Sequence, residues 1–429
     1  MPDPSSTPSA TETIATSDRF ARAEVELRST ETIRKRAKAL LARARRGESA
    51  WFAVNDGAMV TCAILVAELT RVRYPDMKIP YHSRWRHFEA GGIDRAGQLD
   101  AAFKDAAPAE KAHARIDLAL VSVLLDAGAG PAWRYCEAAH GQWPAHEYSR
   151  SEGLGVASFH AFMSGMFSSE AARPLQADAI GLQAVTADKL GQAFQVRADN
   201  LLVGLEGRAA LLRRLGQALQ DQPKLFGQPG RPGHLFELLA KDRKTILAHD
   251  LLSVLLTGLA PIWPAQNAIG SVALGDCWRH AAALADDAAS ASNGWMPFHK
   301  LSQWLTYSLL EPFEWAGIKV EGLDALTGLP EYRNGGLFLD AGVLRLKDNS
   351  PPDHLYAAGD ELIVEWRALT VALLDELAPL VREQLGLTEA QMPLACVLEG
   401  GTWAAGRALA QRLRGGAPPF NIVSDGTVF

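Results

Sequence analysis

The chain has 429 residues, 48% of them hydrophobic and 21% charged, which is enough for one large or two medium globular domains. Its net charge of −6 and pI of about 6.0 argue against a protein that binds nucleic acid mainly through charge. The four cysteines are scattered without a CxxC pair, so they give no zinc knuckle or disulfide framework and fit a reduced, cytoplasmic protein.

The N-terminal stretch, residues 1–25, is rich in Ser, Thr and Pro and lacks the apolar core of a secretion signal. We expect it to be a disordered tail. One compact helical domain should follow over residues 26–429, either undivided or built as two lobes with the site between them. The longest strongly apolar run, Leu251–Trp263, is too short to cross a bilayer, so no membrane contact is expected.

Helical spacing of apolar residues predicts a largely α-helical chain with little strand. The first predicted helix carries a basic face, which fits a solvated surface better than an anion site. The helices expected in the first two thirds of the chain cover residues 30–46, 51–73, 114–127, 132–140 and most of 174–289.

Two polar segments interrupt these helices. In residues 79–94 the loop sequence HSRWRHFEAGG places Arg84, Arg86 and His87 close together, which suits either capture of a phosphate or carboxylate or a local network of ion pairs. Residues 148–155, YSRSEGLG, carry Arg150 and Glu152 and form either a pocket-lining loop or a connector.

The central stretch, residues 297–344, combines a helix with a chemically rich turn. Pro297 suits the first turn of a helix, where its missing N–H costs nothing. Lys300 and Trp304 share a second stripe beside the apolar face, although Trp304 alone favours a core or rim position. The turn that follows, Pro-Glu-Tyr-Arg-Asn-Gly-Gly, places Glu331, Arg333 and Asn334 directly before two glycines.

The C-terminal part predicts a long helix over residues 360–385 and another after LEGGTW, which contains Glu399. Asp425-Gly426 indicates a small terminal hairpin. The sequence has no phosphate-binding loop, no dinucleotide fingerprint, no HExxH and no GxSxG. We therefore expect neither a metal nor an organic cofactor.

Several of these segments in one order resemble the uracil-catabolism protein 4 family of fungi and bacteria. The carrying stretches are HSRWRHFEAGG, RSEGLGVASF, PFHKLSQWLTYSLLEPFEW, PEYRNGGLFLDAGVL, LEGGTWAAGR and SDGTVF. The resemblance implies a role in a pathway that degrades uracil after its conversion to a ribonucleotide. In that pathway the ring is opened and urea is eventually released.

The central stretch is also similar, more distantly, to queuosine-salvage proteins, which are N-glycosylases of a nucleoside monophosphate. The matching segments are PFHKLSQWLTYSLL, DALTGLPEYR and FLDAGVL, and later ELIVEWRALTVALLDEL. The match places their lysine at Lys300 and their aspartate at Glu331. It implies an all-helical fold related to helix-hairpin-helix DNA glycosylases. The longer acid at Glu331 and the absence of a recognisable base-binding portion leave the specificity open.

Together the two resemblances imply hydrolysis of the N-glycosidic bond of a ring-opened uracil ribonucleotide, such as ribosylurea or its phosphate. Glu331 would act as the catalytic carboxylate, and Lys300 would orient it and keep it ionised. Arg333 and Asn334 would hold ribose or phosphate, Arg84, Arg86 and His87 a phosphate, and Glu152 or Glu399 would be a second acid. Trp304 and Arg150 are further candidates for substrate contact.

Three other functions compete with this reading. One is an amidase-type hydrolase of the same opened pyrimidine, and another is a non-catalytic scaffold for the pathway. A DNA-repair glycosylase is disfavoured by the acidic charge of the chain.

Overall fold

A computed structural model describes residues 10–126, 128–139, 145–263, 267–347 and 354–423. The fold is mostly helical, as predicted. The helices are α1 (Ala10–Leu27), α2 (Thr30–Arg45), α3 (Met59–Arg73), α4 (Trp85–Phe88), α5 (Arg95–Ala102), α6 (Pro108–Leu124), α7 (Arg150–Met163), α8 (Ala179–Gln183), α9 (Ala187–Ala193), α10 (Leu205–Asp221), α11 (Pro223–Phe226), α12 (Leu235–Ala240), α13 (Ala248–Gly258), α14 (Lys300–Trp315), α15 (Tyr332–Asp340), α16 (Glu361–Leu385), α17 (Leu394–Val397) and α18 (Trp403–Arg414).

Strands in the described part of the chain occur only in two-stranded sheets. The antiparallel pairs are β1 (Phe52–Val54) with β10 (Leu344–Leu346), β2 (Arg134–Glu137) with β3 (His146–Ser149), β5 (Ala268–Ile269) with β6 (Val272–Ala273), and β7 (Cys277–Arg279) with β8 (Trp295–Pro297). The parallel pairs are β4 (Thr245–Leu247) with β9 (Lys319–Glu321) and β11 (Leu355–Tyr356) with β12 (Asn421–Ile422).

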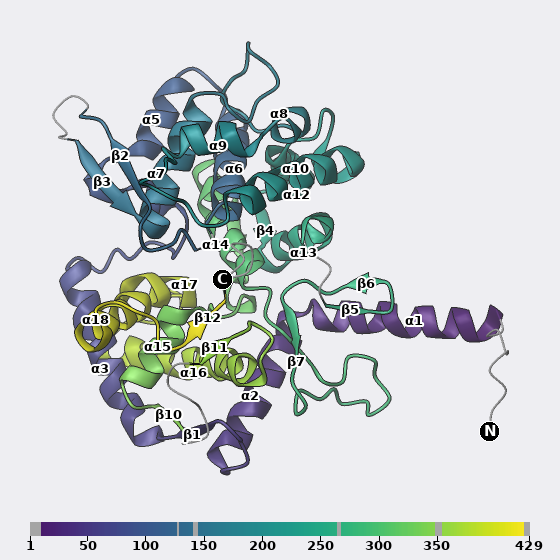
Figure 1. The fold of residues 1–429 in the computed structure, drawn as a ribbon, viewed down its shortest axis with the longest axis vertical. Coiled ribbons are helices and arrows are strands. Elements are labelled where there is room, and N and C mark those ends of the chain that lie inside the picture. Colours follow the sequence, from purple (N-terminus) through teal and green to yellow (C-terminus); the bar gives the residue numbers. More distant parts are fainter. Residues whose placement is uncertain (1–9, 127, 140–144, 264–266, 348–353, 424–429) are drawn as a thin grey trace.

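The helices gather into two groups (Figure 1). The upper lobe contains α4–α14 and the hairpin β2–β3, with α14 packed on α6 and α13. The lower lobe contains α2, α3 and α15–α18, with α16 packed on α2 and α3 and with α15 packed on α18. The chain therefore builds the lower lobe from its two ends, and residues far apart in sequence meet there.

Two long helices form the centre of these lobes. In α14 every residue from Leu301 to Phe313 is buried, and in α16 every residue from Leu362 to Leu374 is buried. A helix that is buried all round must satisfy its polar side chains internally. Thr306 and Ser308 do so by donating to backbone carbonyls one turn earlier. These buried hydroxyl groups of α14 are therefore hydrogen-bonded within the protein.

Several local predictions were wrong. Residues 51–58 form β1 and a short 3-10 turn, so the helix begins only at Met59. Part of 132–140 is strand β2, in which Tyr135 points inward between less buried neighbours. The segment 148–155 is the end of β3 and the first turns of α7 rather than a loop.

Pro297 also differs from the prediction. It ends strand β8 opposite Cys277, and α14 begins three residues later, at Lys300. His299 between them has a left-handed backbone with φ of 49°. The helix therefore starts at Lys300, one of the candidate site residues.

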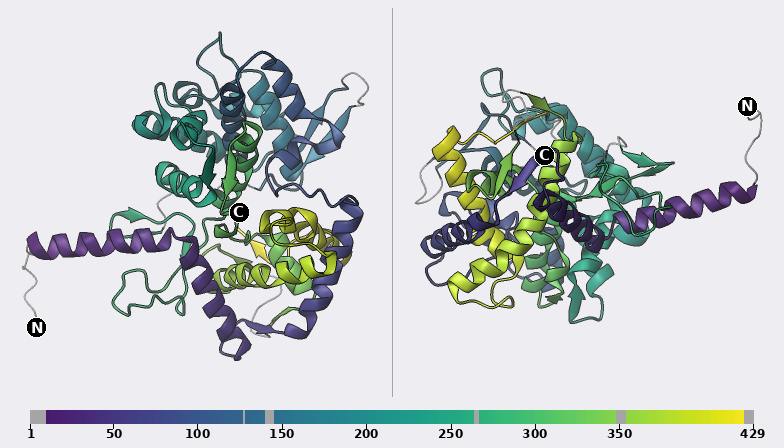
Figure 2. Two further views of the ribbon diagram at one scale, coloured as in Figure 1. Left: turned by 180° about the vertical axis from the view of Figure 1, so that it is seen from behind. Right: turned by 90° about the horizontal axis from the view of Figure 1, so that it is seen from below.

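The N-terminal segment contributes one long helix. Residues 1–9 lie outside the described part of the chain, and α1 covers Ala10–Leu27. Figure 2 shows α1 projecting from the body. Its inner end packs Ala23 and Leu27 into a small cluster with Trp295 and Cys277.

At the other end, β12 pairs with β11, whereas the predicted turn at 425–426 lies outside the described residues. All four cysteines are free thiols. No helix in the described ranges is both long and apolar enough to cross a membrane.

Candidate functional site

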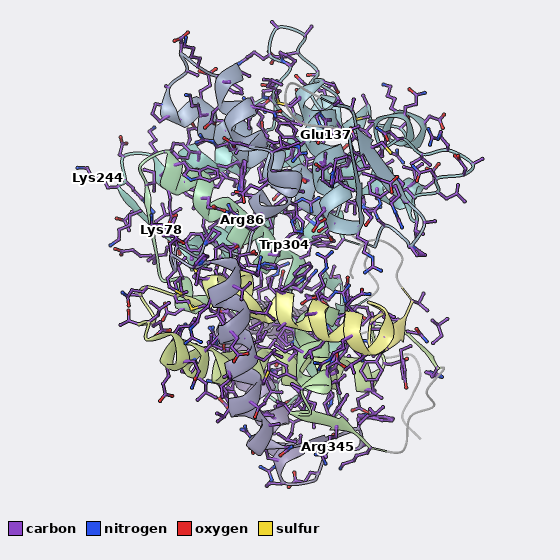
Figure 3. All side chains as sticks on the ribbon, turned by 90° about the vertical axis from the view of Figure 1, so that its left-hand side faces the viewer. Lys78, Arg86, Glu137, Lys244, Trp304 and Arg345 are labelled. Carbon is purple, nitrogen blue, oxygen red and sulfur yellow. The ribbon has the colours of Figure 1, made fainter. Side chains whose placement is uncertain are left out.

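A cavity of about 460 Å³ lies where the two lobes meet. Residues from both lobes line it, among them His82, His87, Asp126, Arg150, Ser151, Lys300, Trp304, Glu331, Tyr332, Trp403 and Ile422. Figure 3 shows Trp304 between the two lobes, just above the yellow helix α18. Two larger hollows, of about 840 and 680 Å³, contain neither Lys300 nor Glu331. We take the smaller cavity as the candidate site because it unites the residues expected to carry the chemistry.

Glu331 is fixed by the start of helix α15. It is the N-cap residue, and its two carboxylate oxygens accept hydrogen bonds from the backbone N–H groups of Arg333 (2.7 Å) and Asn334 (2.6 Å). These N–H groups have no partner inside the helix, so an acid at this position both caps α15 and faces its positive end. The carboxylate is thus held in one orientation in the cavity wall.

Lys300 enters the cavity from the first turn of α14. Its Nζ lies 5.7 Å from the centre of the Trp304 ring. Burial lowers the pKa of Lys300, while the carboxylates of Glu331 and Asp126 act in the opposite direction. The ammonium group therefore holds its proton less tightly than a surface lysine does, although two negative charges surround it.

The effect of the Lys300 charge, which lowers the pKa of Glu331, is smaller than the opposite effect of burial. Burial raises the pKa of Glu331 above its usual value, although its backbone hydrogen bonds and the charge of Lys300 lower it. The charge of Lys300 lowers the pKa of Glu331, as predicted, but burial has the larger effect and the net shift is upward. Desolvation penalises the charged form more strongly than these interactions favour it.

A partly buried ion pair between Asp276 and Arg367 connects the segments that carry the two catalytic candidates. We name this pair the Asp276–Arg367 clamp. Arg367 donates to both carboxylate oxygens of Asp276, at 2.7 and 2.8 Å. Asp276 also accepts the backbone N–H of Lys300 (3.0 Å), and Nε of Arg367 donates to the carbonyl of Pro330 (3.3 Å). The clamp therefore ties the start of α14 to the residue before Glu331.

The clamp keeps its charge under ordinary conditions. Burial acts to raise the pKa of Asp276, but Arg367 and the hydrogen bonds to the carboxylate lower it to about 2. Sequence reasoning missed the function of this pair. Arg367 lay in the segment similar to queuosine-salvage proteins, but Asp276, in DCWRH, had no signal that connected it with a residue 91 positions later.

Asp126, which follows α6, is a second carboxylate in the cavity that sequence reasoning missed. Its Oδ2 lies 3.0 Å from Nη1 of Arg84. Burial acts to raise the pKa of Asp126, but the charge of Arg84, together with Lys300 and a hydrogen bond from Ser151, holds the pKa below its usual value. Arg84 itself is fully buried and also donates to Ser122 (2.6 Å), so it positions Asp126 instead of lining the cavity.

The aromatic wall offers polar atoms without partners. The imidazole of His87 meets the Trp304 ring edge to face, with centroids 5.8 Å apart. Burial and the nearby Arg84 lower the pKa of His87 to about 3, so it is neutral and cannot bind a phosphate by charge. Nδ1 of His87 and Nε1 of Trp304 are buried and have no hydrogen-bond partner among the described residues. A polar ligand in the cavity would satisfy such atoms.

Three other predicted residues lie outside the cavity lining. Arg86 is paired with Glu311 (2.7 Å) and Glu89 (3.1 Å), so its guanidinium is already neutralised. Asn334 is buried behind Glu331 and donates to the carbonyl of Leu329 (3.2 Å).

Glu399 is the third of these. It sits in a π-helical turn, Leu398–Thr402, bonded to His82 (2.8 Å), Arg73 (2.7 Å) and Tyr74 (3.0 Å). Despite burial, the hydrogen bond and charge of His82, together with Arg73, lower the pKa of Glu399 to about 2. An acid that is ionised at neutral pH is a poor proton donor to a leaving group, and Glu399 lies outside the cavity lining, so both observations argue against this role.

The remaining predicted residues meet in a smaller hollow of about 260 Å³, which we name the vestibule. Arg150, Glu152 and Arg333 line it together with Arg134 and Arg407. The vestibule shares lining residues with the main cavity, namely His87, Pro131, Arg150, Ser151, Tyr332 and Trp403.

No group of three or more His, Cys, Asp or Glu side chains in the described ranges could hold a metal ion.

The glycines of these motifs permit close packing. A Cβ on Gly406 would overlap the backbone carbonyl of Arg333, and one on Gly155 would come within 2.8 Å of Cβ of His87. The Gly-rich segments therefore bring helices together around the cavity instead of cradling a phosphate.

Gly406→Ala is therefore expected to destabilise the protein by about 1–3 kcal/mol, because α18 must move away from α15. Ala408→Gln, at an exposed position of the same helix, serves as the control and should change stability little. Urea denaturation of both variants checks this. Equal midpoints for the two would contradict the close approach of the two helices.

Comparison with known proteins gives consistent matches along the chain. Residues 26–429 match the family model described as protein of unknown function DUF1688. The chain is 40% identical over 417 residues to Protein urg3 of Schizosaccharomyces pombe, covering 94% of this chain and 98% of that protein. It is 39% identical over 385 residues to Uracil catabolism protein 4 of Lachancea kluyveri, covering 82% of this chain and 85% of that protein. The chain therefore belongs to the DUF1688 family.

Proposed function

We propose that this protein acts in uracil catabolism as an N-glycosidase, which splits a ring-opened uracil ribonucleoside or ribonucleotide, such as ribosylurea or its phosphate, into urea and the sugar. The pathway is supported by the relative named Uracil catabolism protein 4. The reaction rests on one observation. A carboxylate fixed by two backbone N–H groups, Glu331, shares a cavity with a half-buried lysine, Lys300.

Hydrolysis of an N-glycosidic bond passes through a state with positive charge on C1′ of the sugar. In our proposal the C1′–N bond breaks with its electron pair on the urea nitrogen, and water adds to C1′. Glu331 stabilises the charge on C1′ and accepts the proton that water loses. Asp126, whose pKa is lowered and which is paired with Arg84, adds a second negative charge to the cavity lining.

Urea leaves only if its developing negative charge is neutralised. The Lys300 ammonium is the group proposed for this task, because burial makes it a better proton donor than an ordinary lysine. It would donate to the urea moiety as the bond breaks and recover a proton afterwards from Glu331 or solvent. The unpartnered atoms of His87 and Trp304 would bond to the sugar or to urea.

Release of urea from synthetic ribosylurea and its 5′-phosphate, measured with a urease-coupled assay, tests this function. We expect stoichiometric urea from at least one of the two compounds. A folded protein that releases ammonia without urea would instead be an amidase. A folded protein that releases neither urea nor ammonia would favour the alternative of a non-catalytic scaffold.

The pH dependence of turnover follows from the two pKa shifts. Turnover needs ionised Glu331, whose pKa is raised, and protonated Lys300, whose pKa is lowered. As pH rises, activity should therefore begin above the usual glutamate value of about 4.3 and decline below the usual lysine value of about 10.4. A kcat profile measured between pH 4 and 10 checks both limbs. An acid limb centred at or below the usual glutamate value would contradict the role of Glu331.

A further inference from the structure

The vestibule beside the candidate site is strongly basic. Four arginines line it, Arg134, Arg150, Arg333 and Arg407, against one carboxylate, Glu152. Glu152 lies 3.3 Å from Arg407 at a half-exposed position, so it offsets part of the charge of that one arginine. Arg134 is likewise paired with Glu147, at 3.6 Å. The excess positive charge of the vestibule therefore comes from Arg150 and Arg333, which have no ion-pair partner among the described residues.

Arg333 provides the most rigid part of this charge. Its side chain is only 3% exposed. Nη1 donates to the carbonyl of Gly416 (3.2 Å), whereas Nε is buried and has no partner among the described residues. Its guanidinium carbon lies 4.7 Å from the centre of the Tyr332 ring. A buried guanidinium with an unused donor is costly unless a ligand completes its hydrogen bonds.

Arg150 completes the vestibule from the opposite lobe. It is the first residue of the 14-residue helix α7, with a left-handed φ of 53°. Its exposed guanidinium has no hydrogen-bond or ion-pair partner among the described residues. Strained backbone of this kind tends to occur at ligand sites. The positive end of α7, with Ser149 and Ser151 in the same lining, also favours an anion.

We propose that the vestibule binds a phosphate monoester, so that the protein acts on the 5′-phosphate of its ribosyl substrate instead of the free nucleoside. This inference deepens the proposed function and rests on it for the identity of the sugar. The vestibule adjoins the cavity along His87, Tyr332 and Trp403. A ribose that presents C1′ to Glu331 would therefore extend its 5′ end toward Arg150 and Arg333.

The arrangement of the arginine donors favours binding of a phosphate dianion over binding of a carboxylate. Arginine donors approach from both lobes, Arg150 from α7 and Arg333 from α15. A phosphate monoester has three oxygens that can accept from several directions, and bidentate arginine contacts are strong and specific. Binding it would also link the two lobes across the opening of the cavity.

Isothermal titration of the full-length protein with ribose 5-phosphate, ribose and inorganic phosphate tests the proposal. We expect ribose 5-phosphate to bind at least tenfold more tightly than ribose. Arg150→Gln and Arg407→Gln should each weaken ribose 5-phosphate binding about tenfold, which corresponds to about 1.4 kcal/mol. Arg345→Gln, at an exposed arginine of β10, should leave it unchanged.

The possible outcomes distinguish phosphate binding in the vestibule from the proposed glycosidase activity. Binding of ribose 5-phosphate that depends on Arg150 supports the vestibule even if no urea is ever released. Urea release at equal kcat/KM from phosphorylated and free ribosylurea would overturn the vestibule while the glycosidase stands. Equal affinity of wild type and both arginine variants for ribose 5-phosphate would also overturn it. If Arg150→Gln fails to fold, Arg407→Gln alone decides.

Discussion

Replacing Glu331 by glutamine is expected to lower kcat for urea release by about 10²–10⁴-fold, the range typical of a lost general base. Glutamine has nearly the same shape and can still accept one of the two backbone N–H bonds that cap α15. It cannot accept a proton from water or balance the charge on C1′. The measurement is kcat with saturating substrate.

Loss of the fold would not explain such a result. Burial disfavours the charge of Glu331, so removing that charge offsets part of the lost capping, and stability should change by no more than about 1 kcal/mol. Glu321→Gln, at an exposed position of β9, is the matched control and should keep full activity. A Glu331→Gln variant with near-normal kcat would assign the chemistry to another group.

The second large effect is expected at the Asp276–Arg367 clamp. Arg367→Met should destabilise the protein by about 3–5 kcal/mol, because it leaves the Asp276 carboxylate buried without its partner. Asp276→Asn should cost less, and the double variant should lose less stability than the sum of the two single changes. Chemical denaturation of all three variants measures this coupling.

The clamp should also affect activity, because it connects Lys300 with the residue before Glu331. We expect kcat to fall in Asp276→Asn even at temperatures where the variant is fully folded, with KM less affected. Arg45→Met removes an arginine from ion pairs with Asp56 and Glu376 at the surface and should cost no more than about 1 kcal/mol. Additive effects of the two clamp substitutions would contradict their direct coupling.

A helix or strand of this protein could be predicted from the sequence where neighbouring residues determine it, and not where it depends on a distant segment. The helix at 361–385 follows from local periodicity, and the sequence predicted it over residues 360–385. Strand β1 was missed because it is short and its partner, β10, lies about 290 residues further along the chain. Pro297 was misread because a proline at a strand end and one at a helix start look alike in sequence.

The same distinction applies to the candidate site. Lys300 and Glu331 were found together because they lie within one recognisable stretch, and the structure places both in one cavity. Asp126 and Asp276 were missed because their roles arise only when helices from distant segments meet. Arg86 and Glu399 look free in sequence, yet each is already engaged, by Glu311 and by His82 and Arg73 respectively. Composition cannot reveal such partners.

The most direct measurement is ¹³C NMR of the protein with ribosylurea 5′-phosphate labelled at C1′ and at the urea carbon. We expect the C1′ signal to move to that of free ribose 5-phosphate while the urea carbon appears as intact urea, because the glycosidic bond alone is cut. Conversion of the urea carbon to carbamate or carbonate with C1′ still bonded to nitrogen would contradict a glycosidase and establish cleavage within the urea moiety instead.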